Sequence, residues 1–528
     1  MIWNSGDLGK FPARFGRGGG IESERMARQD LGRKSLLLLG STWFGSALGM
    51  LISILIARTL GPAAVGSIGF SMGLVGLLMA ALLPGFAQAH LKRLAEGQDP
   101  GRCLGTMVTV QLALDLLLLA ALGLAWAVNG FAPWGQLVQV FACMLAAQLA
   151  TGFADIYLKV FLAREWVVPY AVILLVARVA RLVTTVLVLA WAPHITWVAA
   201  TFLLEGLVSL SGAALVLAVR HGIGLRAPTR DSFRGYWRFA RPFLVTTPIA
   251  LFQDSVDRVV VGRWAGLTAA GYYHIARALW EALGSVMQAP ATLLFTRLSQ
   301  LYARRSERGD REARGLFESG LDKLLFLVIP LGLALWAGAE LVILALYGEA
   351  FLPAVWPLRL LVATSVLQAI VNPYTLIVNA LEEAHRFIPV NLLRLAVYLG
   401  VLALLVPWLL PGATGAALAR LILVAFPCWV YMRWTRELAG VGFFPRIPAY
   451  LGAFAVSLLV FHAVAALLGP AHVPQPWPAL PAALVAFVVY FLGLGWMHPQ
   501  TGDNLRYALS LLSPRAFQDF LRAGLRGT

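Results

Sequence analysis

The sequence predicts an all-α, polytopic membrane protein with about fourteen transmembrane helices, on the evidence of its composition and of its repeated apolar runs. The 528 residues are 59% hydrophobic and only 13% charged, whereas soluble domains carry about 25% charged residues. Apolar runs of about 20 residues, long enough to cross ~30 Å of hydrocarbon as helices, recur from Leu36 to Trp496. The sequence lacks the short alternating strands of a membrane β-barrel. Soluble, fibrous and disordered classes are therefore excluded.

The apolar runs also predict the organisation of the chain. The expected spans are 36–57, 65–87, 104–127, 136–157, 167–191, 195–219, 242–263, 269–296, 321–346, 354–379, 388–408, 413–433, 448–469 and 477–497. We expect a cytoplasmic basic tail at 1–35, an N-lobe of six helices at 36–220 and a cytoplasmic linker at 221–241. These are followed by a C-lobe of six helices at 242–435, two further helices at 436–497 and a cytoplasmic amphipathic tail at 498–528.

The distribution of basic residues predicts the orientation in the membrane. Most Lys and Arg residues fall in the two tails and in the loops after even-numbered spans, and cytoplasmic segments carry such an excess. Both termini are thus expected in the cytoplasm of a multi-pass protein of the cell (inner) membrane. The net charge of +16 is accounted for by basic loops beside anionic membrane lipids, so no nucleic-acid partner is implied.

The polar residues do not predict an enzyme. The three cysteines and eight histidines have no metal-ligand spacing, and we expect no metal and no cofactor. The outer loops between the expected spans are ten residues long or shorter, which leaves no room for a catalytic domain. A transporter is the favoured function class.

A repeated motif relates the two halves of the chain. The pattern R-x-x-G-x-x-x-x-G occurs twice, 205 residues apart, at the end of the first and seventh spans. The first copy consists of Arg58, Gly61 and Gly66, and the second of Arg263, Gly266 and Gly271. Transporters often place a central site between two such repeats. The repeat predicts two pseudo-symmetric six-helix lobes, with glycines that permit a sharp turn and close helix packing.

These motifs carry a family resemblance. The stretches Leu55 to Phe86 and Asp257 to Tyr273 resemble polysaccharide and O-antigen flippases of the multidrug/oligosaccharidyl-lipid/polysaccharide exporter superfamily. The resemblance covers nearly the whole chain through the number of spans and the six-plus-six-plus-two organisation. It implies two lobes around a central cavity and movement of an undecaprenyl-pyrophosphate-linked oligosaccharide to the outer leaflet. The partners that the resemblance implies are this lipid-linked oligosaccharide, membrane lipids and the polysaccharide polymerase machinery. The process that it implies is O-antigen, capsule or exopolysaccharide export.

Arginines inside the expected spans are the candidate pyrophosphate ligands, because a guanidinium donates paired hydrogen bonds to phosphate oxygens. An arginine at the centre of a span costs roughly 2.5–3.5 kcal/mol, so it is expected to be paired or to face water. The candidates are Arg178, Arg181, Arg258, Arg277 and Arg394. Arg178 and Arg181 are preferred, since they lie three residues apart on one helix face without an acidic residue in their span. Arg359 and Arg420, nearer the outer ends, could snorkel to the interface.

Acidic residues in the spans are candidate counter-ions or coupling groups. These are Asp115, Glu205, Asp254, Asp257 and Glu281. Asp254 with Arg258, and Arg277 with Glu281, have the i, i+4 spacing of pairs along one helix. Sugar contacts are expected among polar and aromatic residues of three spans, namely Gln253, Tyr272, Tyr273, Gln368, Asn372, Tyr374 and Asn379.

Two alternatives within the superfamily stay open. A lipid II flippase also has fourteen spans and a cationic cavity, although its characteristic first-repeat motifs are not evident in this sequence. A drug or cation antiporter usually has twelve spans and an acidic residue in the first one, whereas span 36–57 has none.

Overall fold

The computed structural model describes residues 21–82, 85–129, 135–241, 243–302, 307–381, 383–468 and 479–497. These residues are almost entirely helical and contain no strand, so the predicted all-α class is confirmed. Most of the expected N-terminal tail (residues 1–20) and the expected C-terminal tail (498–528) lie outside the described residues. Among those described, ten helices are long and apolar enough to cross a membrane. The predicted spans 242–263, 269–296 and 477–497 coincide with three further helices.

The first half of the chain forms seven helices. They are α1 (Ile21–Leu82), α2 (Phe86–Ala95), α3 (Pro100–Asn129), α4 (Gln136–Ala163), α5 (Val167–Trp191), α6 (Ile195–His221) and α7 (Arg230–Ala240). Two predicted spans lie in α1, which is interrupted at Gly61. The φ angle of 76° at Gly61 lies in the left-handed region, and Pro62 follows, so this glycine allows the chain to turn between two helical segments. The predicted linker 221–241 contains the short helix α7.

The second half contains the remaining helices. They are α8 (Phe243–Trp264), α9 (Gly266–Tyr302), α10 (Glu307–Ala337), α11 (Ala339–Tyr347), η2 (Glu349–Ala354), α12 (Val355–Ala380), η3 (Ala384–Arg386), α13 (Phe387–Leu404), η4 (Leu405–Leu409), α14 (Ala413–Ala425), α15 (Cys428–Ala439), α16 (Ile447–Leu468) and α17 (Ala479–Met497). Two predicted spans are each divided between two helices, because 321–346 covers most of α10 and α11 and 413–433 covers α14 and part of α15.

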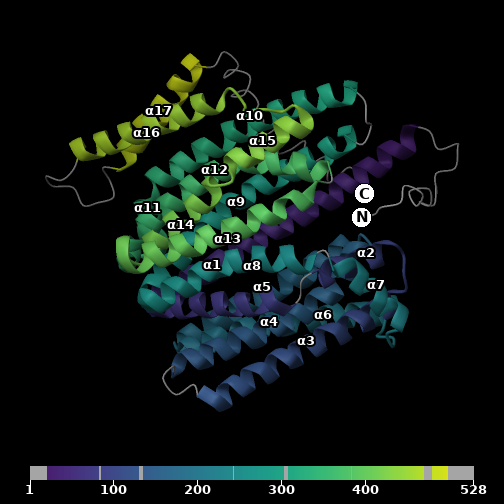
Figure 1. Ribbon diagram of the computed structural model, residues 1–528. Helices are drawn as coiled ribbons and strands as arrows, with labels where there is room; N and C mark the ends of the chain where they lie inside the picture. Colours follow the sequence, from purple (N-terminus) through teal and green to yellow (C-terminus); the bar gives the residue numbers. More distant parts are fainter. Residues whose placement is uncertain are drawn as a thin grey trace.

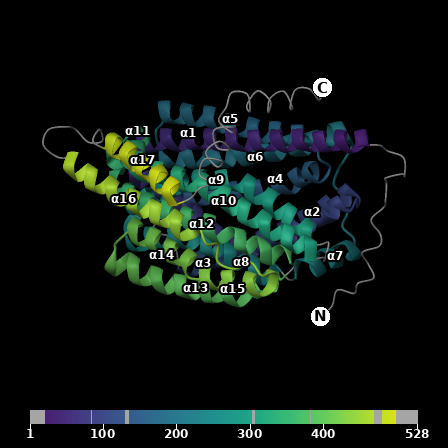
Figure 2. The same ribbon diagram turned by 90° about the horizontal axis from the view of Figure 1, so that it is seen from above.

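The helices are arranged as two halves with α1 between them. Figure 1 shows α3, α4, α5 and α6 together on one side, and α9, α10, α12, α14 and α15 on the other. The pair α16 and α17 packs on the outside of the second group, against α10. The helices α2 and α7 lie at the opposite end of the bundle from α11 in both views (Figures 1 and 2). The structure thus has two groups of helices with α1 between them and the pair α16 and α17 at the outside.

The helices α2 and α7 are held together at their end of the bundle by a buried histidine outside the membrane spans. The His90 Nδ1 lies 2.8 Å from the Tyr236 hydroxyl, and Nε2 lies 3.1 Å from the Ile156 carbonyl oxygen. Burial lowers the pKa of His90 to about 4, so the ring is neutral near pH 7. A neutral ring donates to Ile156 and accepts from Tyr236, which connects three helices.

The two copies of the repeated motif meet where the halves are in contact. A Cβ atom added to Gly66 would overlap the Leu267 carbonyl oxygen, and one added to Gly271 would overlap the Pro62 carbonyl oxygen. The missing side chains therefore let α1 and α9 approach backbone to backbone. At the same motif, the Arg58 Nε donates to the Leu346 carbonyl oxygen at 2.8 Å, at the C-terminus of α11. The glycine contact and the hydrogen bond from Arg58 to the end of α11 both join the first half of the chain to the second.

Alanine at either glycine is expected to destabilise the protein. Because the added methyl group meets rigid backbone rather than a mobile side chain, we expect Gly66→Ala and Gly271→Ala each to cost roughly 1–3 kcal/mol. Thermal unfolding of the detergent-solubilised protein measures this. Gly284→Ala on α9 is the matched control, since its Cβ meets no atom within 4 Å. Equal midpoints for the three variants would show that the close approach contributes nothing to stability.

Candidate functional site

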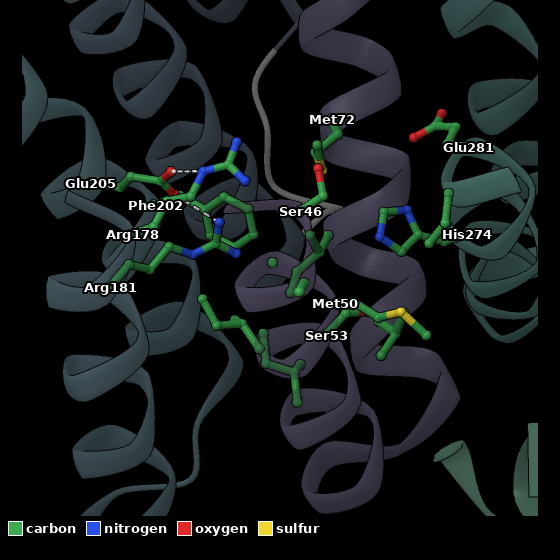
Figure 3. Close-up of a pocket in the computed structure, with 18 of the residues that line it drawn as sticks. Ser46, Met50, Ser53, Met72, Arg178, Arg181, Phe202, Glu205, His274 and Glu281 are labelled. Carbon is green, nitrogen blue, oxygen red and sulfur yellow. Dashed lines mark hydrogen bonds and ion pairs between the residues drawn. The ribbon is translucent and has the colours of Figure 1, made fainter. Parts of the chain in front are cut away.

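A cavity of about 600 Å³ lies between the two halves of the molecule. One wall is formed by α5 and α6, the opposite wall by α9, and both segments of α1 contribute to the lining (Figure 3). Val65 and Ile68, which lie one and two residues from Gly66, line the cavity, so the contact between α1 and α9 borders it. Its position between the repeats is the one expected of a transporter site.

Three charged side chains form one wall of the cavity. The Arg181 Nη1 donates to Glu205 Oε2 at 2.9 Å, and Arg178 Nε lies 3.7 Å from Glu205 Oε1. These residues come from facing helices, with both arginines on α5 and the glutamate on α6. Two cations share one carboxylate, so the wall carries a net charge of +1. Figure 3 shows the three side chains grouped together at the cavity.

The two arginines differ in how firmly they are held. The Arg181 side chain is 13% exposed and its guanidinium lies 3.4 Å from the centre of the Phe202 ring, so a cation–π contact and an ion pair fix it. The Arg178 side chain is 38% exposed. Its guanidinium passes Gly45 on α1, where a Cβ atom would lie 2.9 Å from Nη1. Arg178 therefore has more donor capacity available to a bound anion than Arg181 has.

The opposite wall of the cavity is provided by α9. His274 and Glu281 face the cavity there, across from the arginine pair (Figure 3). Glu281 accepts a hydrogen bond from Arg277 Nε at 2.6 Å and lies 3.5 Å from Arg258 Nη2. Its carboxylate is therefore neutralised from behind by two arginines, and the wall adds little net negative charge to the cavity.

Behind this wall lies a buried cluster of charges centred on Asp257. The Asp257 carboxylate is fully buried and contacts Arg420 Nη2 at 2.5 Å and Arg277 Nη1 at 3.4 Å. The hydroxyl groups of Tyr273 and Tyr398 donate to the same carboxylate at 2.6 and 3.0 Å. Its partners come from α9, α13 and α14, so one carboxylate of α8 connects four helices of the second half.

Several candidate residues occupy positions that the spacing along one helix does not predict. Asp254 contacts Arg277 at 2.5 Å and Arg420 at 3.6 Å rather than pairing along α8 with Arg258. Among the candidate counter-ions, Glu205 lies beside the two arginines of α5. Asp115 instead accepts from Gln111 Nε2 at 3.0 Å on its own helix.

The second motif arginine and the candidate Arg394 lie apart from this cavity. Arg263 is exposed near the end of α8. Arg394 lines a separate groove in the second half, where its Nη1 donates to Asn391 Oδ1 at 3.1 Å. Two candidate sugar contacts are buried and already bonded: Tyr273 to Asp257, and Tyr374 to the Phe444 amide at 3.1 Å. Gln253 is also buried and donates to the Asn391 carbonyl oxygen at 3.2 Å.

Sequence reasoning missed two contributors. Arg420 was expected to be able to snorkel to the interface, yet its side chain is 7% exposed and bonded to Asp257, 163 residues earlier. Phe202 cannot be recognised from the sequence, because one aromatic residue in an apolar span carries no signal. A contact between helices that are far apart in the sequence leaves no local pattern, so the contacts of Arg420 and Phe202 could not be predicted from the spacing of residues along one helix.

Comparisons with known proteins agree with this architecture. The sequence model of the polysaccharide biosynthesis protein family matches residues 31–302, more than half of the chain. The chain belongs to this family. A curated relative, the probable low-salt glycan biosynthesis flippase Agl15 of Haloferax volcanii, is 22% identical over 360 residues, covering 65% of this chain and 70% of that protein.

Solved structures share the fold. The lipid II flippase MurJ in an inward closed conformation matches with a TM-score of 0.66 at 15% identity, over 88% of this chain and 99% of that one. An inward-facing multidrug resistance MATE family transporter of the MOP superfamily matches with a TM-score of 0.59 at 16% identity, over 75% and 94%. By family this chain is a multi-pass polysaccharide biosynthesis protein, its fold is similar to that of these two transporters, and a curated relative is a probable glycan biosynthesis flippase.

Proposed function

We propose that the protein moves an undecaprenyl-pyrophosphate-linked oligosaccharide from the cytoplasmic to the outer leaflet of the cell membrane by alternating access. The exported oligosaccharide is used for an O-antigen, a capsule or an exopolysaccharide. In this proposal both termini face the cytoplasm, and Arg178 and Arg181 bind the pyrophosphate.

The observation that carries the proposal is the cationic wall of the cavity between the two halves. A pyrophosphate needs several strong donors, and Arg178 is exposed to the cavity while Arg181 holds the shared Glu205. The remaining lining is mostly apolar, with Trp43, Met50 and Met72 among the side chains that line it. Such a surface tolerates a lipid tail beside the charged head group. A site for cationic drugs would instead require an excess of acidic groups.

The arrangement of the motif supports alternating access. The contact between Gly66 and Leu267 brings α1 and α9 together at one boundary of the cavity. In the proposed cycle this contact opens when the opposite end closes. Both helices are also continuous with the cavity wall, so separating them moves the wall and the gate together.

Transport of a labelled substrate by reconstituted protein tests the proposal. Undecaprenyl-pyrophosphate oligosaccharide with a fluorescent sugar label is placed in both leaflets of proteoliposomes, and an impermeant reductant is added outside. We expect the reductant to quench nearly all of the label, because the protein exchanges it between leaflets. In protein-free vesicles it reaches only the outer leaflet.

Two further substrates separate this proposal from its alternatives. Labelled lipid II and a labelled cationic drug are assayed in the same vesicles. Faster movement of lipid II, or of the drug, would assign the protein to that substrate instead. Quenching that stops at the protein-free level for all three would overturn the transport assignment itself.

A further inference from the structure

A second, strongly polar groove of about 260 Å³ lies within the second half of the molecule. Four polar residues of α12 line it: Gln368, Asn372, Thr375 and Asn379. Their spacing of four, three and four residues places them along one helix face. A continuous polar stripe on a membrane-spanning helix is costly against lipid, so its exposure to a groove requires a polar occupant.

The facing wall of the groove adds a cation and two aromatic rings. Phe387, Asn391 and Arg394 lie four and three residues apart on α13, and Tyr431 contributes from α15. Arg394 Nη1 donates to Asn391 Oδ1 at 3.1 Å and to the Tyr431 hydroxyl at 3.4 Å, and its buried Nε has no hydrogen-bond partner in the protein. The rings of Phe387 and Tyr431 pack edge to face with centroids 5.5 Å apart.

We infer that this groove binds sugar residues of the transported molecule, at a site separate from the cationic cavity. The inference rests on the proposed function and adds to it the place where the glycan is recognised. Sugar hydroxyls both donate and accept hydrogen bonds, and side-chain amides offer both functions. The partly exposed Phe387 ring, supported from behind by the buried Tyr431, provides the apolar surface on which the C–H face of a sugar ring packs.

The composition of the groove favours a sugar over a phosphate. A pyrophosphate binds best to several cations, and Arg394 is the one arginine or lysine among the residues that line this groove, beside four amides. The groove also has less than half the volume of the cavity between the halves, at about 260 Å³ against about 600 Å³. It suits one or a few sugar units rather than a lipid-linked head group as a whole.

The double variant Asn372→Ala, Asn379→Ala tests the inference. Both side chains are exposed in the groove, so their removal leaves the buried packing of α12 in place. Loss of two neutral hydrogen bonds is expected to raise the KM for flipping of the labelled undecaprenyl-pyrophosphate oligosaccharide about tenfold. Binding of farnesyl pyrophosphate, which has the pyrophosphate but no sugar, is expected to stay unchanged. Asn372→Gln, Asn379→Gln retains the amides and is expected to recover part of the loss.

The outcomes separate this inference from the proposed function. Gln148→Ala, which removes an exposed amide from α4, is the matched control and is expected to transport like the parent. If the parent flips the labelled oligosaccharide and the double alanine variant does so with the same KM, the groove does not bind sugar. A weakened affinity of that variant for farnesyl pyrophosphate would also overturn the inference, because the groove would then contribute to the pyrophosphate site. A parent that moves no oligosaccharide contradicts the proposed function.

Discussion

The triple variant Arg178→Gln, Arg181→Gln, Glu205→Gln is expected to insert normally and to flip lipid-linked oligosaccharide at least about 100-fold more slowly than the parent. The physical reason is the loss of two charge-assisted donors to pyrophosphate, each contributing roughly 1.5–3 kcal/mol. Removing the arginines alone would leave Glu205 without the two cations that neutralise it, so all three charges are removed together. The proteoliposome quenching assay gives the rate, and the amount of folded protein is measured in parallel.

Two single variants serve as controls for this experiment. Glu205→Gln alone retains both cations and is expected to keep most of the transport rate, with an unchanged or tighter affinity for farnesyl pyrophosphate. Arg178→Lys retains the charge but loses the paired donor geometry, so it is expected to recover transport only in part. Transport by the triple variant at the parental rate would assign the pyrophosphate to another part of the molecule.

Replacing Asp257 by asparagine is expected to destabilise the protein by roughly 3–5 kcal/mol, the usual cost of breaking a buried ion pair from one side. The variant leaves Arg277 and Arg420, whose side chains are 3% and 7% exposed, without their central carboxylate. Thermal unfolding in detergent measures the loss, and a lower yield of folded protein is expected with it.

Asp254→Asn is the matched comparison for this variant. Asp254 contacts the same two arginines, but its side chain is 54% exposed, so we expect a clearly smaller loss of stability. The double variant Asp257→Leu, Arg420→Met removes a buried pair together and is expected to be more stable than Asp257→Asn. Similar midpoints for the two single asparagine variants would argue against Asp257 as the centre of the cluster.

The fold was largely predictable from the sequence because its main signals are local. A run of apolar residues long enough to cross the membrane can be recognised from the sequence alone, and the repeat at Arg58 and Arg263 predicts two related sets of helices. The points at which a predicted span is broken into two helices were harder to predict from the sequence. The division of 413–433 into α14 and α15 occurs inside a continuous apolar segment, where the hydropathy gives no sign of a helix break.

The candidate site was predictable only in part, because its contacts join distant helices. The spacing of Arg178 and Arg181 places them on one face, but nothing in the sequence distinguishes Glu205 from Asp115 as their partner. For Tyr273 and Tyr374, residue type alone indicated sugar contacts, whereas both hydroxyl groups are bonded within the protein. Burial decides whether a polar group is available, and burial depends on packing between helices.

The contact between the two glycines has the form of a symmetric dimer interface. Gly66 meets the carbonyl group of Leu267, and Gly271 meets that of Pro62. Replacing each residue by its counterpart 205 residues away, Gly66 by Gly271 and Leu267 by Pro62, turns the first contact into the second, so each half offers the other the same contact. This reciprocity defines an isologous interface between identical subunits. Away from this contact the two halves differ, because one carries the cationic wall and the other the amide-lined groove. At the contact itself, a side chain added to either glycine would meet the backbone of the other half.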